Sequence, residues 1–384
     1  MTTRSLTLRI HFFLPGMHRV NRGAEAAFES VAIEIAKLGL DEVTVIGSGK
    51  PLPDRPYRFQ RCGLIPRERF EKIPKFPPFR SEYVDEEATW VLNYLARYRP
   101  SKADVTVTCS YPFVNWMLTR WPPFRRRPTH IFVTQNGDLP AYSDVSEYQL
   151  FRCDGLVCTN PKFYERNKDR WPSVLLSNGI DPLRFSPGPS VRDRFGLPQN
   201  GIIVLMVSAL VESKRVLEGM RSVAKIPDAI LVVAGDGPLR EQFDALGDEL
   251  MPGRVKRLIL PADQMPNIYR SADVLLHPTL FESFGNVYIE AMAVGLPVVA
   301  HDYEVTRWIF GDYPGLVNAL DEAALAKAIA WAVREGRNGS VTLAATAADR
   351  FSWHKIARQY RDFFFAVYQR RRGLDALSIP AQEG

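Results

Sequence analysis

Cysteine, long apolar runs and closely spaced metal ligands are all scarce in this sequence. The 384 residues include only four cysteines, namely Cys62, Cys109, Cys153 and Cys158. So few cysteines exclude a disulfide scaffold, and they predict reduced thiols in a reducing compartment. The longest apolar runs, near 202–207 and 296–300, are far shorter than the roughly 20 residues that cross a bilayer as a helix. Because residues 1–8 lack the apolar core of a signal peptide, we expect a cytoplasmic protein.

Neither sign of charge dominates, but the charge is unevenly distributed. The net charge is +6, with 46% hydrophobic and 24% charged residues, which is ordinary for a folded protein with a large core. At roughly 100–200 residues per domain, the length predicts two domains or more. Residues 1–190 hold 27 basic and 20 acidic side chains, whereas residues 191–384 hold 22 and 23. The basic first half predicts an anionic partner, either a phosphate-bearing substrate or an anionic membrane, with a solvated basic face as the alternative.

Short apolar strands alternate with amphipathic helices through both halves of the chain. We predict strands at 8–14, 42–46, 104–109, 130–134, 155–158 and 174–176, then at 202–207, 230–234, 257–260, 274–276 and 297–300. We predict helices at 23–38, 85–98, 215–223, 238–246, 287–294, 321–335, 341–350 and 352–368. The alternation predicts an α/β fold of two Rossmann-like, doubly wound domains facing across an interdomain cleft. The Pro-, Arg- and aromatic-rich segment 51–78 does not fit this pattern and is expected to be an irregular excursion.

A stretch rich in Pro, Gly and Ser at 185–190 marks the predicted domain boundary. We therefore expect an N-terminal domain over 1–183, a linker over 184–195 and a C-terminal domain over 196–352. The helix 353–372 is expected to pack back toward the N-terminal domain, and 373–384 to be a flexible tail.

Two acidic residues flank a predicted helix start in the segment 277–290. Gly285 and Asn286 open a helix whose free N–H groups and positive dipole end suit a phosphate. Glu282 lies in the preceding loop and Glu290 lies one to two turns into the helix. Carboxylates repel phosphate but accept hydrogen bonds from hydroxyls, so we expect both to contact sugar or ribose hydroxyls. Taken alone, the pattern is equally compatible with structural packing.

Three other loops follow predicted strands. Lys214 and Arg215 come after the strand 202–207, where cations would neutralise a diphosphate. Gly235 begins a turn after the strand 230–234, and Gly23 opens the first helix of the other domain. We expect these loops and the Glu282 loop to line one cleft from two sides.

The order and spacing of these motifs resemble the retaining glycosyltransferases of family four, which have the GT-B fold. The likeness covers nearly the whole chain and rests on the two acids Glu282 and Glu290, which are separated by seven residues. It also rests on four supporting segments, at 177–181, 235–238, 269–274 and 290–298. The resemblance implies a hexosyltransferase that moves a sugar, with retention, from a nucleoside diphosphate sugar to a glycan or lipid-linked acceptor. It implies no metal and no cofactor, and the scattered histidines agree, because they form no pair at helical ligand spacing.

The resemblance also implies roles for individual residues. Glu290 would bind the ribose hydroxyls, Glu282 would bind the donor sugar, and Lys214 and Arg215 would stabilise charge on the leaving diphosphate. The diphosphate would lie in a cradle of backbone N–H groups from Phe284, Gly285, Asn286 and Val287. The N-terminal domain would bind the acceptor and the C-terminal domain the donor. On the acceptor side the matching position is Asn136, with Asp138 as the other polar candidate and a plain turn as the alternative reading.

Two positions depart from the family pattern. Ala209 stands where relatives often carry Arg, and Arg22 stands where the N-terminal loop often has Gly. These departures leave open a catalytically weak sugar-nucleotide-binding subunit, and the fold leaves open a GT-B sugar epimerase or phosphorylase.

The segment 120–127 combines Arg with aromatic residues. Its Arg125, Arg126 and Arg127 suit an anionic membrane surface, as in enzymes of polysaccharide and cell-envelope biosynthesis, with an ordinary basic loop as the alternative. We therefore expect a cytoplasmic protein, peripheral at the inner face of the cell membrane, with no nucleic-acid partner.

Overall fold

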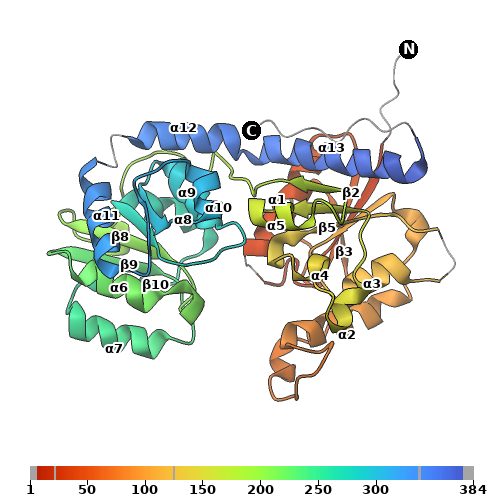
Figure 1. The fold of residues 1–384 in the computed structure, drawn as a ribbon, viewed down its shortest axis with the longest axis horizontal. Helices are drawn as coiled ribbons and strands as arrows, with labels where there is room; N and C mark the ends of the chain where they lie inside the picture. The colour runs from red at the N-terminus through yellow and green to blue at the C-terminus, as the bar shows by residue number, and fades with distance from the viewer. Residues whose placement is uncertain (1–6, 21–22, 124–125, 336–338, 375–384) are drawn as a thin grey trace, which may run out of the picture. The chain divides into compact units, whose positions relative to one another are not determined.

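The computed structural model describes residues 7–20, 23–123, 126–335 and 339–374, which form two compact units (Figure 1). Unit 1 contains the residues up to Asn178 together with those from Trp353 onward, and unit 2 spans Gly179–Ser352. Each unit is a parallel sheet between two layers of helices, as the alternation in the sequence predicts.

Unit 1 has a seven-stranded parallel sheet in the order β3-β2-β1-β4-β5-β6-β7. Its strands are β1 (Arg9–Phe13), β2 (Glu42–Gly47), β3 (Arg58–Arg61), β4 (Val105–Thr108), β5 (Thr129–Val133), β6 (Gly155–Cys158) and β7 (Ser173–Leu175). Its helices are α1 (Gly23–Lys37), α2 (Glu82–Leu95), α3 (Phe113–Arg120), α4 (Leu139–Tyr142), α5 (Pro161–Asn167) and α13 (Trp353–Arg372). The strand order reverses at β1, which makes the sheet doubly wound.

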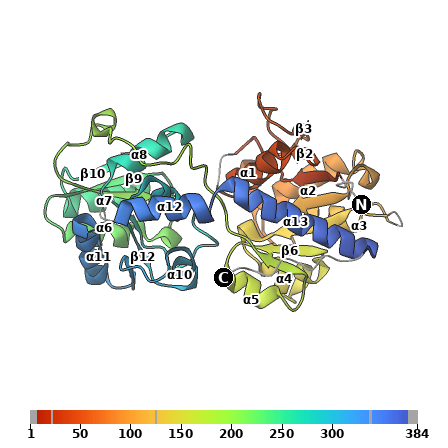
Figure 2. The same cartoon turned by 90° about the horizontal axis from the view of Figure 1, so that it is seen from above.

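Alternating side chains divide the core of unit 1 between the two faces of its sheet. Phe12 packs into the cluster that holds α1 and α13, while its neighbour Phe13 packs with α2 and α3 on the opposite face. Figure 2 shows α13 running beside α1 across the sheet. The Arg361 guanidinium fixes α13 further by an ion pair of 2.6 Å with Asp41, whose side chain is fully buried.

Unit 2 repeats the same architecture with six parallel strands in the order β10-β9-β8-β11-β12-β13. Its strands are β8 (Ile202–Val207), β9 (Ala229–Ala234), β10 (Val255–Leu258), β11 (Val274–His277), β12 (Val298–His301) and β13 (Leu316–Val317). Its helices are α6 (Val216–Ala224), α7 (Arg240–Leu250), α8 (Met265–Ser271), α9 (Asn286–Val294), α10 (Glu304–Phe310), α11 (Glu322–Glu335) and α12 (Ser340–Arg350). Leu205 faces the cluster of α8, α9 and α12, and Met206 faces that of α6, α7 and α11.

The expectation of an irregular segment at 51–78 was wrong in one part. Residues 58–61 form β3, which pairs in parallel with β2 at the edge of the sheet. The strand was overlooked because Arg58 and Arg61 are exposed at the edge, so it lacks the apolar run of a central strand. Phe59 packs against the core, and this contact holds the edge strand in place.

The residues 184–195 belong to unit 2 and pack against the rest of it. Phe185 is buried against the ring of Tyr269. Arg192 is also buried, and its guanidinium forms an ion pair of 2.7 Å with Asp273, next to the start of β11. These contacts tie the segment to the helices and strands that follow it.

Candidate functional site

The loops that follow β8, β9 and β11 lie at one edge of the unit 2 sheet. All strands of the sheet are parallel, so their carboxyl ends share this edge. Lys214 lies in a short 3₁₀ turn after β8, Gly235 directly follows β9, and Glu282 lies in the loop between β11 and α9. The loops after the neighbouring strands β8 and β11 contact each other here, because the Lys214 ammonium forms an ion pair with the Glu282 carboxylate.

Glu282 is the centre of this cluster. Its Oε1 also lies 2.9 Å from Nε2 of His277, at the end of β11, and its backbone N–H donates to the Tyr303 hydroxyl at 3.1 Å. Burial by itself would raise the pKa of the Glu282 carboxyl, but the contacts with His277 and Lys214 outweigh it and lower that pKa. The carboxylate is therefore ionised and held in one place before any ligand arrives.

The start of α9 is shaped by Gly285. This residue has φ +86°, and a Cβ on it would overlap the ring of Tyr288. Phe284 is buried, with its ring packed against Trp308 and Phe351 at centroid distances of 6.0 and 6.2 Å. The backbone is thus fixed at the N-terminal end of α9, where the positive end of the helix dipole favours an anion. Asn286 and Val287, the other two residues of the predicted cradle, are the first two residues of α9.

A different partner holds Glu290, in the second turn of α9. The Tyr269 hydroxyl of α8 donates to Glu290 Oε2 at 2.7 Å. Burial raises the pKa of the Glu290 carboxyl, although the Tyr269 hydrogen bond and the charge of Arg184 oppose the rise. The two predicted acids therefore differ electrostatically. The surroundings of Glu282 stabilise its ionised form, whereas those of Glu290 disfavour the ionised form.

The two predicted cations, Lys214 and Arg215, have different partners. Lys214 reaches Glu282, whereas Arg215 forms an ion pair of 3.3 Å with Glu218 and donates to the Ala319 carbonyl at 3.3 Å. Arg215 thereby spans from α6 to the segment before α11. Ala209 is exposed.

Gly235 allows the loops after β8 and β9 to touch. A Cβ on Gly235 would collide with the Ser208 carbonyl. Just beyond, Leu210 donates to the Asp236 carbonyl at 3.1 Å, and the Leu210 carbonyl accepts from Leu239 at 3.0 Å. These bonds lock the two loops together at the carboxyl edge of the sheet.

The predicted residues of unit 1 lie after its own strands. Gly23 is exposed at the start of α1, and Asn136 is exposed in the turn after β5. Asp138 is 4% exposed, and its Oδ2 accepts from Asn167 at 2.8 Å and lies 3.2 Å from Arg166 Nε. Burial raises the pKa of the Asp138 carboxyl, against the effect of Arg166 and Asn167. Of the two acceptor-side candidates, Asn136 is the accessible one.

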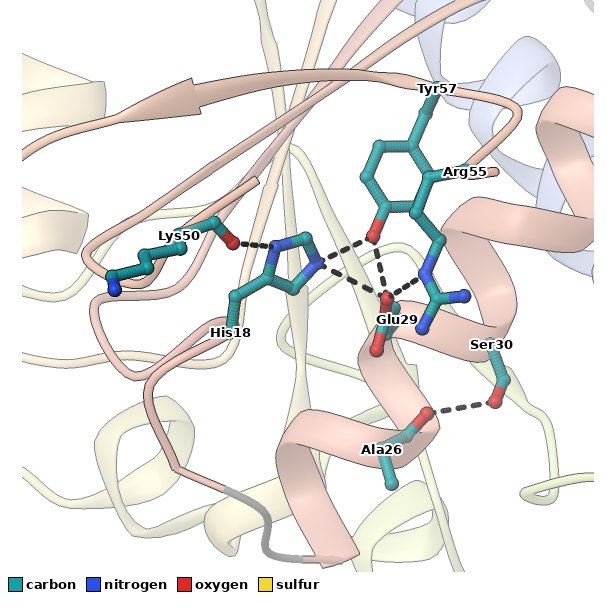
Figure 3. A network of polar contacts seen from close by, with 7 residues as sticks. All are labelled: His18, Ala26, Glu29, Ser30, Lys50, Arg55 and Tyr57. Atoms are coloured by element: carbon teal, nitrogen blue, oxygen red, sulfur yellow. Dashed lines mark hydrogen bonds and ion pairs between the residues drawn. The ribbon is translucent and has the colours of Figure 1, made fainter. Parts of the chain in front are cut away.

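The loop between β1 and α1 is anchored by a polar network (Figure 3). The His18 ring contacts the Lys50 carbonyl at 2.9 Å through Nδ1 and the Tyr57 hydroxyl at 2.7 Å through Nε2. Tyr57 in turn donates to Glu29, and Arg55 donates to the same carboxylate oxygen at 2.7 Å. The network supports the chain that leads to the start of α1; Arg22 itself lies outside the described residues.

Three contributors to the unit 2 cluster were not predicted as site residues. His277 was in view, because it directly follows the predicted strand 274–276 and lies five residues before Glu282, but this position alone indicated no role for it. Tyr303 and Tyr269 each reach one of the two acids from 21 residues away. Tyr269 opens the segment 269–274 that supports the resemblance, but no local pattern indicates either contact.

Neither a metal cluster nor a membrane-spanning helix is found in the part of the chain that the structure describes. It contains no group of three or more His, Cys, Asp or Glu side chains placed to hold a metal ion. No helix there is long and apolar enough to cross a membrane.

Residues 189–346 match the sequence profile of a family described as Glycosyl transferases group 1. A phosphatidyl-myo-inositol mannosyltransferase of Mycolicibacterium smegmatis is 30% identical over 198 residues, which cover 49% of this chain and 50% of the relative. A D-inositol 3-phosphate glycosyltransferase of the same organism is 37% identical over 143 residues, covering 35% of this chain and 33% of the relative. The alignments thus span about a third to a half of these relatives.

Solved structures resemble the chain over nearly its full length. Sucrose-phosphate synthase from Thermosynechococcus elongatus superposes with a TM-score of 0.73 at 21% identity, covering 94% of this chain and all of that one. Anabaena Alr3699/HepE, crystallised with UDP and glucose, gives 0.71 at 17% identity, with coverage of 94% and 100%. The two parallel-sheet units thus have the GT-B fold, and residues 189–346 match the profile of the glycosyl transferases group 1.

Proposed function

We propose that this protein is a retaining glycosyltransferase that moves a sugar from a nucleoside diphosphate sugar to a glycan or lipid-linked acceptor without a metal. The observation that carries the proposal is the cluster of Lys214 and Glu282 beside the start of α9, with Glu290 one turn further on. A cation, helix N–H groups and two carboxylates in different electrostatic states match a ligand with phosphates at its centre and hydroxyls at both ends. The family of residues 189–346 supports a transferase of this kind.

The charge of Lys214 serves the bond-breaking step. Cleavage of the bond between the anomeric carbon and the diphosphate oxygen leaves negative charge on the diphosphate, and a fixed ammonium stabilises it. In the structure the Glu282 carboxylate forms an ion pair with this ammonium. An incoming diphosphate would take over Lys214, while His277 continues to hold Glu282, whose free oxygen can accept hydroxyls of the donor sugar.

The remaining donor contacts follow from α9. The backbone N–H groups of Phe284–Val287 would cradle the diphosphate, and Gly285 permits the turn that places them. Glu290 would bind the ribose hydroxyls with the oxygen that Tyr269 leaves available. Gly235 would serve by letting the two loops approach. Arg215 would contribute its charge from α6.

The acceptor is assigned to unit 1. Asn136, exposed after β5, is the proposed acceptor-side group, with Asp138 behind it as the buried alternative. The mannosyltransferase relative is named for a phosphatidyl-myo-inositol, which supports a lipid-linked acceptor. Docking on an anionic membrane is proposed through Arg126, which is exposed, and Arg127; the third predicted arginine, Arg125, lies outside the described residues.

The test is a donor panel with product analysis. UDP-, GDP- and ADP-sugars are screened by thermal shift, since a ligand at about 100 times its Kd stabilises by about 2.7 kcal/mol. The stabilising donor is then incubated with candidate acceptors, with and without a chelator. Acceptor-dependent release of nucleoside diphosphate, insensitive to the chelator, with a product of unchanged anomeric configuration by NMR, is expected. Conversion of the donor alone, or release of a sugar phosphate, would contradict the proposal.

A further inference from the structure

A basic pocket of about 280 Å³ lies at the amino edge of the unit 1 sheet. It is formed by the end of α3, the start of β5, the residues before β6 and the end of α13. Its charged and titratable lining residues are Arg120, Arg127, His130, Arg152, Cys153, Asp154 and Arg371. Asn136 and Asp138 follow the carboxyl end of β5, so this pocket lies at the opposite edge of the sheet from them.

The pocket has a strong excess of positive charge. Its carboxylate, Asp154, forms an ion pair of 2.7 Å with Arg371 and accepts from the His130 backbone N–H at 2.7 Å. Burial, reinforced by the charge of Arg371, lowers the pKa of His130 to about 3, so its ring is neutral. One acid therefore faces four guanidinium groups, three of which lie outside that ion pair.

Two of these guanidinium groups have buried donors that lack an acceptor. The Nε atoms of Arg120 and Arg127 are buried without a hydrogen-bond partner among the described residues. Arg127 Nη2 donates to the Arg120 carbonyl at 2.9 Å, which fixes its direction. A buried donor without an acceptor is costly, so a ligand oxygen that accepted from it would be favoured.

The walls of the pocket are held rigidly. His130 lies between the Thr106 hydroxyl, 3.0 Å from Nδ1, and the Asn115 amide, 3.2 Å from Nε2. The same amide nitrogen donates to the Arg152 carbonyl at 2.9 Å. This network fixes the backbone before β6 against α3 and β5, so this side of the pocket is already formed before a ligand binds.

We propose that this pocket binds a phosphate group, carried by a free phosphate compound or by a lipid headgroup. Guanidinium groups present paired N–H donors that fit phosphate oxygens, and several of them converging on one space favour an anion with more than one charge. The volume admits a phosphate or diphosphate with part of its substituent. Cations are excluded by the same charge.

The first arm of the test measures inorganic phosphate and pyrophosphate binding by calorimetry at constant ionic strength. The full chain is compared with Arg127→Gln and with Arg152→Gln, which alters an exposed side chain and spares the fold. Arg358→Gln, an exposed arginine elsewhere on α13, is the matched control for loss of charge. All variants are made in a Lys214→Ala background, so that the candidate site in unit 2 contributes less to the measured phosphate binding. We expect each pocket variant to weaken phosphate binding about tenfold. Equal affinities in the pocket variants and the control, or no binding by the parent, would overturn the proposal.

The second arm identifies the carrier of the phosphate. Co-sedimentation is measured with vesicles of phosphatidylcholine alone and with added phosphatidic acid. Phosphate binding in the first arm, together with vesicle binding that requires phosphatidic acid and is lost in Arg127→Gln, supports the proposal and assigns a lipid headgroup. Phosphate binding in the first arm without vesicle binding supports it and assigns a free phosphate compound. Vesicle binding that is equal in Arg127→Gln and Arg358→Gln, with no phosphate binding, would show surface charge only and would overturn it.

Discussion

Replacement of Lys214 by Ala is expected to reduce kcat far more than it affects donor binding or folding. A unit charge about 4 Å from an ammonium interacts by about 4 kcal/mol at an effective dielectric constant of about 20. Much of the charge on the diphosphate appears only as the glycosidic bond breaks. The expected loss is therefore about 2.7 kcal/mol in the transition state, or about 10²-fold in kcat.

The effect on stability should be small. The Lys214 side chain is 26% exposed and that of Glu282 is 17% exposed, so their ion pair is partly screened. Its loss should change the unfolding free energy by less than about 1 kcal/mol, because His277 still contacts Glu282. For a unit of this size such a change moves Tm by at most about 2–4 °C.

The assay is release of nucleoside diphosphate in the presence of acceptor, with kcat and the KM for donor measured separately. Lys225→Ala is the matched control, because Lys225 also pairs with a glutamate, Glu322 at 3.1 Å, but at the other end of α6. A folded Lys214→Ala variant with kcat within about threefold of the parent would refute the reasoning. A raised KM with unchanged kcat would instead assign Lys214 to ground-state binding.

Three further predictions concern donor binding and folding. Glu290→Ala should raise the KM for donor about tenfold in steady-state assays with little change in kcat, because ribose contacts are equal in substrate and transition state. Gly285→Ala should lower the unfolding free energy in urea titrations by more than the strain of about 1–2 kcal/mol expected at positive φ, because its Cβ meets Tyr288. The control is Gly253→Ala, which lies in open space at φ +71° and should show only that strain. Asp41→Ala should destabilise unit 1 by about 3 kcal/mol in the same titrations, because it leaves the guanidinium of α13 without its partner.

The central strands were predictable from the sequence because both of their faces are buried. β8 and β11 consist almost wholly of buried apolar residues, so a continuous apolar run identifies them without reference to periodicity. The edge strand β3 has its first and last residues exposed and its two middle residues half-buried. The helix α5 is only seven residues long and has a polar sequence. Such elements are held by tertiary contacts, which a local pattern does not contain.

The residues of the candidate site likewise include some that the sequence predicts and some that depend on tertiary contacts. Glu282 and Lys214 stand out because the fold itself places the loops that follow parallel strands at one edge of the sheet. Their ion pair depends on side chains 68 residues apart, and the difference between Glu282 and Glu290 depends on His277 and Tyr269. Those neighbours are set by how α8 and β11 pack, so no local pattern distinguishes the electrostatic states of the two acids.

The difference between these two acids predicts opposite effects of pH on stability. The folded pKa of Glu282 lies below the usual value of about 4.3, so the unfolded chain takes up the proton first. Glu282 therefore stabilises the fold above about pH 4.3, and this contribution is lost as pH falls through its lower folded pKa.

Glu290 behaves in the reverse sense. Its folded pKa is raised, so the folded chain takes up the proton first as pH falls from neutral toward about 4.3. The cost of burying its charge, present at neutral pH, is relieved across that range, and stability gains accordingly. The measurement is urea unfolding of the ligand-free parent, Glu282→Gln and Glu290→Gln from pH 7 to pH 3.5. The stability of the parent relative to Glu290→Gln should rise as pH falls to about 4.3, and its stability relative to Glu282→Gln should fall below that pH. Parallel pH profiles for the two variants would contradict the assignment of a stabilised carboxylate beside Lys214 and a disfavoured one beside Tyr269.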